Sequence, residues 1–503
     1  MNIAEALPRN AQRFPKKPAL VDGKRRLTYK DLHLRTNRLG NYLLKQGIRP
    51  GDPVALSCGS RAEHFEILFA LAKIGAIAFP FDYHWSAREG EAMIEFSEPR
   101  AFIVEGRDET RELWQRVCEC SGPGNSLGIE MSTGAGTSYE EALSSSPADD
   151  PGIQVSGKNI FLVMITSGTT GFPRGCAVNH ETYLRRCINN IAGKELSQNE
   201  RALSMLPLHF NAGRGSMMRM LYLGATVFLQ EKFDEKVFLE IVEGEKITYT
   251  MLVPALCNRL LQCEKLDQFQ TSSLDYVGIT GGHLSRDVAQ GMIERVCPRL
   301  YEAYASTDCG PMTVLAPEDR ASHGDSVGRP IPCVMLKITD EGDEEVPSGS
   351  EGEIFVHTPL AIQGYYRNPQ ATDEFLRGGW CRTGDVGFVD PAGYLHISGR
   401  RKLMIKSGGI SIFPEEIEET LLRHPAVAEA AVVGVKSPQW EEAVKALVVL
   451  KKGASLDRES LIRFCKESLA SYKAPKFVEF MPSLPRTGLG KINRGKLEEM
   501  NRA

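Results

Sequence analysis

Hydrophobic and polar positions follow two different spacings along the chain. Residues 29–46 and 62–73 carry apolar side chains at helical spacing, whereas residues 53–57 form a short apolar run that is typical of a buried strand. Helix-like and strand-like segments continue to alternate between residues 160 and 300. Because such alternation usually produces a mostly parallel sheet covered by helices, the pattern predicts an α/β protein.

The pattern changes in the last third of the chain. Strand-like runs flank an acidic turn at residues 340–345, which predicts a strand-rich subdomain. A basic segment then precedes a helix that begins at Pro414, with Glu415 and Glu416 in its first turn. We therefore predict an N-terminal domain of α/β subdomains and a small mobile α/β domain at the C-terminal end, with these limits: domain 1–398, hinge 399–402, domain 403–503.

Composition narrows the class of protein. A chain of 503 residues is long enough for two or more domains, and 42% hydrophobic with 25% charged residues is ordinary for a globular protein. The net charge of −4 weighs against a general nucleic-acid binder, and the twelve cysteines contain no C-x-x-C pair. No apolar run reaches the roughly 18 residues of a membrane span, and the first residues do not resemble a signal peptide. We expect reduced thiols and a cytoplasmic location.

A loop rich in glycine and hydroxyl groups follows the apolar run 161–165. It reads Thr-Ser-Gly-Thr-Thr-Gly-Phe-Pro-Arg-Gly over residues 166–175. Glycines let backbone N–H groups turn inward, hydroxyls add donors and the arginine adds charge, so the loop can hold a polyphosphate. The spacing differs from the Walker sequence, and the alternative is an ordinary surface loop.

This loop resembles the phosphate loop of the adenylate-forming superfamily, which includes acyl-CoA synthetases, adenylation domains of peptide synthetases and luciferases. The family pattern is Thr-Ser-Gly-Thr-Thr-Gly-x-Pro-Lys-Gly, and Arg174 stands where lysine is usual. The charge is kept, but a planar guanidinium replaces a compact ammonium. The resemblance implies ATP binding by these residues: Thr166, Ser167, Gly168, Thr169, Thr170, Gly171 and Arg174.

Two further segments resemble the adenine and α-phosphate side of the same family. Residues 304–308, Tyr-Ala-Ser-Thr-Asp, are similar to the family's Tyr-Gly-x-Thr-Glu. The resemblance implies that Tyr304 lies beside the adenine, that Thr307 binds the α-phosphate and is catalytic, and that Asp308 is the metal site for Mg²⁺. Asp308 is one methylene shorter than the usual glutamate, but it keeps the oxygen ligands that Mg²⁺ prefers. Gly281 and Gly282 are similar to the family's adenine-side turn.

The ribose contacts are implied by two later motifs. Residues 380–385, Trp-Cys-Arg-Thr-Gly-Asp, match the family's Trp-x-Arg-Thr-Gly-Asp, and residues 398–402, Ser-Gly-Arg-Arg-Lys, resemble the element that follows it. The resemblance implies that Asp385 and Arg400 bind the ribose of ATP. It also places Lys402 at the hinge about which the small domain rotates.

The last motif lies close to the C-terminal end. Residues 485–494 resemble the family's Pro-x-Thr-x-x-Gly-Lys-x-x-Arg loop, and Lys491 falls at the lysine that the family needs for adenylation. The resemblance also implies that Gly408 and Gly409 line the tunnel for the pantetheine of coenzyme A.

The implied reaction is ATP-dependent activation of a carboxylic acid as an acyl-adenylate, followed by transfer to coenzyme A. ATP, Mg²⁺ and coenzyme A are the expected ligands, and the chain is interpreted as an acyl-CoA synthetase, with a homo-oligomer left open. The acyl pocket is expected to use these residues: His209, Phe210, Asn211, His283, Ala303 and Ala305.

The segment 207–213 bears on the choice of acid. Relatives that activate amino acids carry an aspartate there to bind the ammonium group, and this chain has none. A plain carboxylic acid is therefore predicted. The neighbouring Arg214 is interpreted as a helix-surface arginine, and contact with a second carboxylate of the acid is the alternative.

Two other functions remain open from the sequence. The chain would also fit a stand-alone adenylating enzyme that loads an acyl-carrier protein, because both acceptors present a pantetheine thiol. The departures at Arg174, Ala305 and Asp308 raise a second alternative, a weakly catalytic nucleotide-binding homologue. The retained Thr307 and Lys491 favour a working enzyme.

Overall fold

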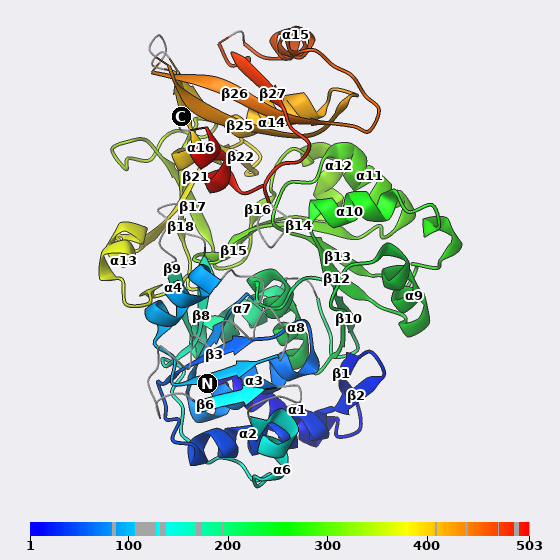
Figure 1. The fold of residues 1–503 in the computed structure, drawn as a ribbon, viewed down its shortest axis with the longest axis vertical. Helices are drawn as coiled ribbons and strands as arrows, with labels where there is room; N and C mark the ends of the chain where they lie inside the picture. The colour runs from blue at the N-terminus through cyan, green and yellow to red at the C-terminus, as the bar shows by residue number, and fades with distance from the viewer. Residues whose placement is uncertain are drawn as a thin grey trace. The chain divides into compact units, whose positions relative to one another are not determined.

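The structure of the chain is a computed structural model, and it falls into two compact units (Figure 1). It describes residues 1–82, 87–105, 127–130, 137–166, 174–193, 195–407, 410–437, 441–470, 472–486 and 492–501. Unit 1 contains residues 1–335 and 357–381, and unit 2 contains residues 336–356 and 382–503. Both units combine helices with strands, which confirms the predicted α/β class. The division at 1–398, 399–402 and 403–503 stays a prediction.

A nine-stranded sheet forms one half of unit 1. Its strands, in spatial order, are β16 (Arg329–Pro330), β15 (Gly310–Leu315), β14 (Leu300–Ser306), β13 (Tyr276–Ile279), β12 (Tyr249–Leu252), β10 (Arg201–Ser204), β11 (Thr226–Leu229), β1 (Pro18–Asp22) and β2 (Arg25–Thr28). From β14 to β1 the neighbouring strands are parallel, and the strands at both ends pair in the antiparallel sense. The predicted parallel arrangement is therefore found here.

The two faces of this sheet pack differently. Side chains alternate along a strand, so Val277 and Ile279 of β13 enter a core shared with α9 (Glu235–Glu245), α10 (Pro254–Leu261) and α11 (Arg286–Arg295). On the alternate positions three tyrosine rings stack across β12, β13 and β14. Their ring centroids are 4.8 Å apart for Tyr249 and Tyr276, and 4.5 Å apart for Tyr276 and Tyr301.

An eight-stranded sheet forms the other half of unit 1. Its order is β19 (Gly364–Tyr365), β9 (Arg174–Asn179), β8 (Ile160–Thr166), β4 (Ile77–Pro80), β3 (Pro53–Ser57), β5 (Ala101–Val104), β6 (Leu127–Glu130) and β7 (Thr137–Ser138). The segment from β8 to β7 is parallel, while β9 pairs with β8 and β19 in the antiparallel sense. The antiparallel edge places Tyr365 beside Cys176, a contact that matters for the site below.

Local sequence explains where the main helices of unit 1 begin and end. Thr28 and Asp31 form a capping box at the start of α2 (Tyr29–Lys45), and Gly75 ends α3 (Ala62–Ile74) with a φ of 72°. Helix α3 is buried along its whole length. The other helices of unit 1 are η1 (Ile3–Glu5), α1 (Ala6–Arg13), α4 (Ala87–Ser97), α6 (Tyr139–Ser144), α7 (His180–Ala192), α8 (Asn211–Leu223), η2 (Leu266–Gln268), η3 (Pro317–Asp319), α12 (Arg320–His323) and α13 (Pro369–Phe375).

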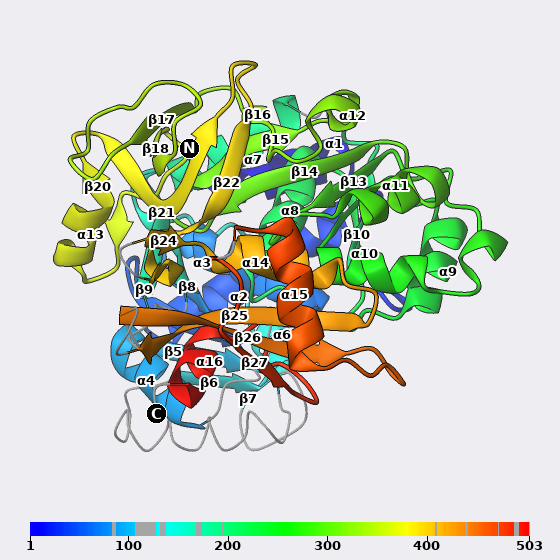
Figure 2. The same cartoon turned by 90° about the horizontal axis from the view of Figure 1, so that it is seen from above.

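Unit 2 contains most of one sheet and all of another. The first comprises β17 (Met335–Thr339), β18 (Gly352–His357), β20 (Leu376–Arg377), β21 (Trp380–Val389) and β22 (Leu395–Arg400). The second comprises β23 (Ile405–Ser407), β24 (Ile410–Ile412), β25 (Val427–Ser437), β26 (Glu441–Leu450) and β27 (Phe477–Phe480). Figure 2 shows α14 (Pro414–Leu422) and α15 (Arg458–Ser468) beside the long strands β25 and β26, and their apolar side chains share one core with them. Helix α16 (Arg494–Met500) contributes Leu497 to a second, smaller cluster. Within the described parts of the chain, no helix is long and apolar enough to cross a membrane.

Candidate active site

The ends of the predicted phosphate loop are fixed by a strand pair. Thr166 at the end of β8 pairs with Arg174 at the start of β9 in the antiparallel sense. The other predicted ATP contacts of this loop, Ser167, Gly168, Thr169, Thr170 and Gly171, lie outside the described residues.

Asp308 lies close to the second of these ends. It occupies the turn between β14 and β15, and its carboxylate accepts hydrogen bonds from Tyr365 Oη at 2.5 Å and from Cys176 Sγ at 3.2 Å. The Arg174 guanidinium carbon lies 5.5 Å from the centroid of the Tyr365 ring. Arg174 also lies 3.9 Å from Glu374. Tyr365 therefore connects two motifs that are more than 130 residues apart in the sequence.

The backbone around Asp308 is held by a buried arginine. Arg186 of α7 donates to the carbonyl of Leu360 at 2.7 Å and to the carbonyls of Thr307 and Asp308, both at 3.1 Å. Burial lowers the pKa of Arg186. Because the guanidinium bonds to the backbone and not to the Asp308 carboxylate, it fixes the turn without forming a salt bridge there.

The predicted adenine-side turn has a supporting carboxylate that the sequence did not identify. Gly281 has a φ of 83°, which favours glycine, and His283 Nδ1 lies 2.6 Å from Glu302 Oε1. Glu302 is only 2% exposed and also accepts a hydrogen bond from Arg320 at 3.3 Å. The His283 side chain is 42% exposed, and its ring is fixed from the protein side by Glu302.

Strand β14 carries the predicted adenine contact Tyr304 and the predicted acyl contacts Ala303 and Ala305. Ala303 and Tyr304 are half-buried, whereas Ala305 is exposed. Thr307 follows directly after the strand and is half-buried. Their order along one strand keeps the predicted adenine, acyl and phosphate contacts next to one another.

The predicted acyl segment, residues 207–213, lies inside unit 1 and makes close contacts there. His209 Nε2 lies 3.4 Å from Asp82 Oδ2, and the rings of His209 and Phe210 are 4.1 Å apart. Helix α8 begins at Asn211, and a Cβ on Gly213 would lie 2.6 Å from the Leu206 carbonyl oxygen. Glycine is therefore required where the helix approaches the preceding loop.

The interpretation of Arg214 as a helix-surface arginine is wrong. Arg214 is 1% exposed, and its Nη1 donates to the carbonyls of Leu208 at 3.0 Å and His209 at 2.8 Å. The reason is that α8 is buried on nearly all sides, with Met217, Met218 and Leu221 also inaccessible. The polar and glycine residues around Arg214 in the sequence do not indicate this burial.

In unit 2 the two predicted ribose contacts are cross-strand neighbours. Asp385 of β21 pairs with Arg400 of β22, and Arg400 Nε lies 2.9 Å from Asp385 Oδ1. Asp385 is buried, whereas the Arg400 side chain is 61% exposed. Lys402, the predicted hinge residue, lies in the short helix η4 (Arg401–Leu403), which follows β22 directly.

The loop that carries Lys491 is also fixed at its ends. Arg486 and Ile492 form an isolated bridge, and Arg494 donates to the Glu418 carboxylate at 2.8 and 2.6 Å. Lys491 itself lies outside the described residues, as do the predicted tunnel residues Gly408 and Gly409.

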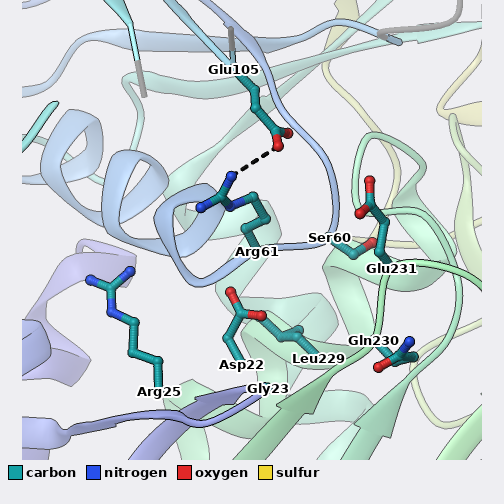
Figure 3. Close-up of a pocket in the computed structure, with 9 residues that line it drawn as sticks. All are labelled: Asp22, Gly23, Arg25, Ser60, Arg61, Glu105, Leu229, Gln230 and Glu231. Atoms are coloured by element: carbon teal, nitrogen blue, oxygen red, sulfur yellow. Dashed lines mark hydrogen bonds and ion pairs between the residues drawn. The ribbon is translucent and has the colours of Figure 1, made fainter. Parts of the chain in front are cut away.

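A separate cleft of ≈410 Å³ lies elsewhere on unit 1 (Figure 3). It is lined by Asp22 at the end of β1, Arg25 at the start of β2, and residues that follow β3, β5 and β11, among them Arg61, Glu105 and Glu231. Arg61 Nη1 lies 2.9 Å from Glu105 Oε1, and Asp22 accepts the Ala62 N–H, so these groups largely satisfy one another. The cleft contains none of the residues predicted for the nucleotide or acyl site.

Comparison with known proteins defines the class. The sequence pattern of the AMP-binding enzyme family matches residues 7–366, and that of the AMP-binding enzyme C-terminal domain matches residues 416–491. The chain belongs to the AMP-binding enzyme family. The predicted adenylate-forming superfamily and the predicted AMP-forming acid–thiol ligase are both confirmed.

Individual relatives are similar to this chain over nearly its whole length. A putative acyl-CoA ligase of Bacillus subtilis, YdaB, is 34% identical over 490 residues, which is 95% of each chain. A feruloyl-CoA synthase of an Amycolatopsis species is 33% identical over 97% of each chain. The structure of the anthranilate CoA ligase AuaEII in complex with anthranoyl-AMP has a TM-score of 0.91 at 26% identity and covers 100% of this chain and 97% of its own.

Proposed function

We propose that this ligase activates a carboxylic acid with ATP and transfers the acyl group to coenzyme A, using the predicted site residues of both units. One observation supports this site above the others. The Tyr365 ring lies beside Arg174 and its hydroxyl donates to Asp308, so both residues lie close together in unit 1. A phosphate-loop cation and a carboxylate at one place suit a polyphosphate and its counter-ion.

In unit 1 the loop residues and Arg174 hold the β- and γ-phosphates. Thr307 donates to the α-phosphate, where the acid's carboxylate attacks, and Tyr304 and the Gly281–Gly282 turn contact the adenine. Attack by one anion on another needs positioning and charge neutralisation more than covalent chemistry.

Asp308 suits a magnesium ion. Within the described part of the chain its carboxylate is held by the neutral donors Cys176 and Tyr365 and forms no salt bridge, so its negative charge stays available. Carboxylate oxygens are preferred ligands of Mg²⁺. A bound Mg²⁺ would offset phosphate charge, and Asp308 would hold it directly or through a water.

Unit 2 supplies the other contacts of the proposal. Asp385 accepts hydrogen bonds from the ribose hydroxyls, Arg400 adds a donor, and Lys491 bridges the acid's carboxylate and the α-phosphate. After adenylation, rotation about Lys402 withdraws Lys491 and brings Gly408 and Gly409 to the pantetheine.

Coenzyme A as the acceptor and a cytoplasmic location are also part of this proposal. Coenzyme A is preferred over an acyl-carrier protein because the relatives named above are CoA ligases and synthases. A cytoplasmic location agrees with the cysteines, since ten of the described ones are free thiols and form no disulfide. The acid lies against His209, Phe210, Asn211, His283, Ala303 and Ala305.

The test is ATP–pyrophosphate exchange over aliphatic, aromatic and alicyclic acids, repeated with coenzyme A to follow AMP release. Exchange with CoA-dependent AMP release supports the proposal. Exchange without it indicates a carrier-protein acceptor, and no exchange with any acid indicates a nucleotide-binding homologue.

Lys491→Ala tests the division of labour between the half-reactions. The variant should abolish exchange but retain CoA-dependent thiolysis of a supplied acyl-adenylate, and equal loss of both contradicts the role. Lys496→Ala is the matched control, because Lys496 is an exposed lysine on α16 only five positions further along the chain.

A further inference from the structure

Three helices of unit 1 bring together buried polar atoms that have no hydrogen-bond partner. The residues are His64 of α3, Tyr183 of α7 and Arg214 of α8, which we call the Arg214 cluster, and they are 1%, 3% and 1% exposed. Among the described residues, nothing bonds to His64 Nε2, Tyr183 Oη, or Arg214 Nε and Nη2. Buried polar atoms are nearly always satisfied, so a group of such atoms indicates a missing acceptor.

The charge of the Arg214 cluster is positive. Burial lowers the pKa of Arg214 only to about 10, so its guanidinium stays charged near neutrality. The pKa of Tyr183 is raised by burial, and the pKa of His64 is lowered by burial and then by the charge of Arg214, so both are neutral. No described carboxylate forms a salt bridge with Arg214. A buried cation without a counter-ion is costly, so an anion would relieve it.

The geometry of Arg214 specifies how that anion binds. Its Nη1 is occupied by the Leu208 and His209 carbonyls. The two atoms left, Nε and Nη2, form the edge of the guanidinium that matches both oxygens of a carboxylate. Tyr183 and His64 both interact electrostatically with Arg214, and each has a polar atom without a partner that is able to donate a hydrogen bond.

The cluster adjoins the predicted acyl segment, because Arg214 holds the backbone of His209. We propose that the acid activated by this enzyme carries a second carboxylate, which binds the Nε–Nη2 edge of Arg214, with Tyr183 as an additional donor. This inference rests on the proposed function, since it assigns the far end of the same acyl site. The substrate class is then a dicarboxylic acid, activated at one end and recognised at the other.

Buried water is the competing occupant of the cluster, because a few ordered waters can also satisfy orphaned donors. The two occupants differ in what they require of the substrate. If water fills the cluster, kcat/KM should not depend on a carboxylate at the far end of the acid. If a substrate carboxylate fills it, kcat/KM should be lower for acids that lack one.

The first experiment uses the wild-type enzyme and pairs of acids of equal length. Exchange is measured for glutarate, adipate, suberate and terephthalate, each beside its monomethyl ester. At least one diacid should show a kcat/KM about 30-fold above that of its ester, because a charged, bidentate contact is lost in the ester. Esters equal to or better than every diacid overturn the inference but leave the proposed function intact. No exchange with any acid overturns both.

The second experiment removes single groups. Tyr183→Phe deletes only the orphaned hydroxyl, so it should retain or raise the melting temperature and reduce the diacid-to-ester ratio about fivefold. A merely structural hydroxyl would leave that ratio unchanged, which contradicts the inference. Arg214→Met should bring the ratio close to one by raising KM for the diacid.

Arg219→Met is the matched control for Arg214→Met. Arg219 is a second buried arginine on α8, and its Nη1 also has no partner among the described residues, but it makes no hydrogen bond to the acyl segment there. It should leave the diacid-to-ester ratio unchanged. An equal fall of the ratio in both arginine variants would overturn a specific role for Arg214.

Discussion

Asp308 in unit 1 and Asp385 in unit 2 are two carboxylates proposed to serve the same nucleotide, yet their surroundings differ. Asp308 accepts hydrogen bonds from the neutral groups of Tyr365 and Cys176, at 2.5 and 3.2 Å. Asp385 is buried and lies 2.9 Å from the Nε of Arg400, whose side chain is largely exposed. One carboxylate is oriented without being neutralised, and the other is paired with a charge that solvent can reach.

The surroundings of each carboxylate suit its proposed partner. A metal ion needs a negative charge that no protein cation has already cancelled. Ribose hydroxyls are neutral, so a carboxylate that binds them can keep a cation beside it and still accept their hydrogen bonds. Four substitutions test this contrast.

Asp308→Asn removes the charge and keeps the shape. We expect kcat/KM for adenylation to fall about 100-fold, because an electrostatic contact to the reacting phosphates is lost. Initial rates of pyrophosphate exchange at several Mg²⁺ concentrations measure it. Asp267→Asn, at an exposed carboxylate of unit 1 that pairs with Arg295, is the control. Unchanged Mg²⁺ dependence in Asp308→Asn would show that this carboxylate is structural.

Asp385→Asn should act on binding. We expect KM for ATP to rise about 30-fold while kcat changes little, since hydrogen bonds to a charged acceptor are weakened. Comparing ATP with 3′-deoxy-ATP gives a specific readout, because the wild type should discriminate between them and the variant should not. Retained discrimination in the variant would contradict the ribose contact.

Tyr365→Phe removes one donor from Asp308 and keeps the ring beside Arg174. A loss of about fivefold in kcat/KM is expected, because Cys176 still orients the carboxylate. The double variant with Asp308→Asn should lose little more than Asp308→Asn alone. Additive losses would mean that the hydroxyl acts independently of Asp308.

Arg174→Lys should have the smallest effect. The charge remains in place, so activity should stay within about threefold of wild type or rise slightly. Steady-state kinetics with ATP as the varied substrate measure this. A collapse of activity would show that the planar guanidinium beside Tyr365 is required.

Local patterns predicted part of the fold. The apolar run at residues 161–165, predicted as a buried strand, lies in β8, and the helical spacing of residues 29–46 and 62–73 corresponds to α2 and α3. These features succeed because they depend on residues that are adjacent in the sequence.

Contacts between distant segments were missed for a physical reason. Tyr365 reaches Asp308 only because β19 pairs with β9, and Arg186 reaches backbone carbonyls, which carry no sequence signature. Glu302 anchors His283, but it belongs to none of the sequence motifs described above. A tyrosine or a glutamate at such positions looks the same in sequence whether it faces solvent or a site.

Arg214 shows the limit of polarity patterns. Its neighbours Asn211, Gly213, Gly215 and Ser216 give the start of α8 the composition of a surface helix. Most of the helix is nevertheless buried, and Gly213 serves there for close approach to backbone. Burial of a helix depends on what covers it, and that is decided by strands and helices elsewhere in the chain.

The tyrosine stack of Tyr249, Tyr276 and Tyr301 gives unit 1 an optical label of its own. Rings held 4.8 and 4.5 Å apart in a fixed, nearly parallel arrangement couple their electronic transitions and produce a near-ultraviolet circular dichroism signal that disappears when tertiary packing is lost. The stack spans three strands of a single sheet, so its signal follows the melting of that sheet. Other aromatic side chains, among them the buried Tyr394 of unit 2, add to the same signal, so the part of the signal that Tyr276→Leu removes would report the melting of this sheet.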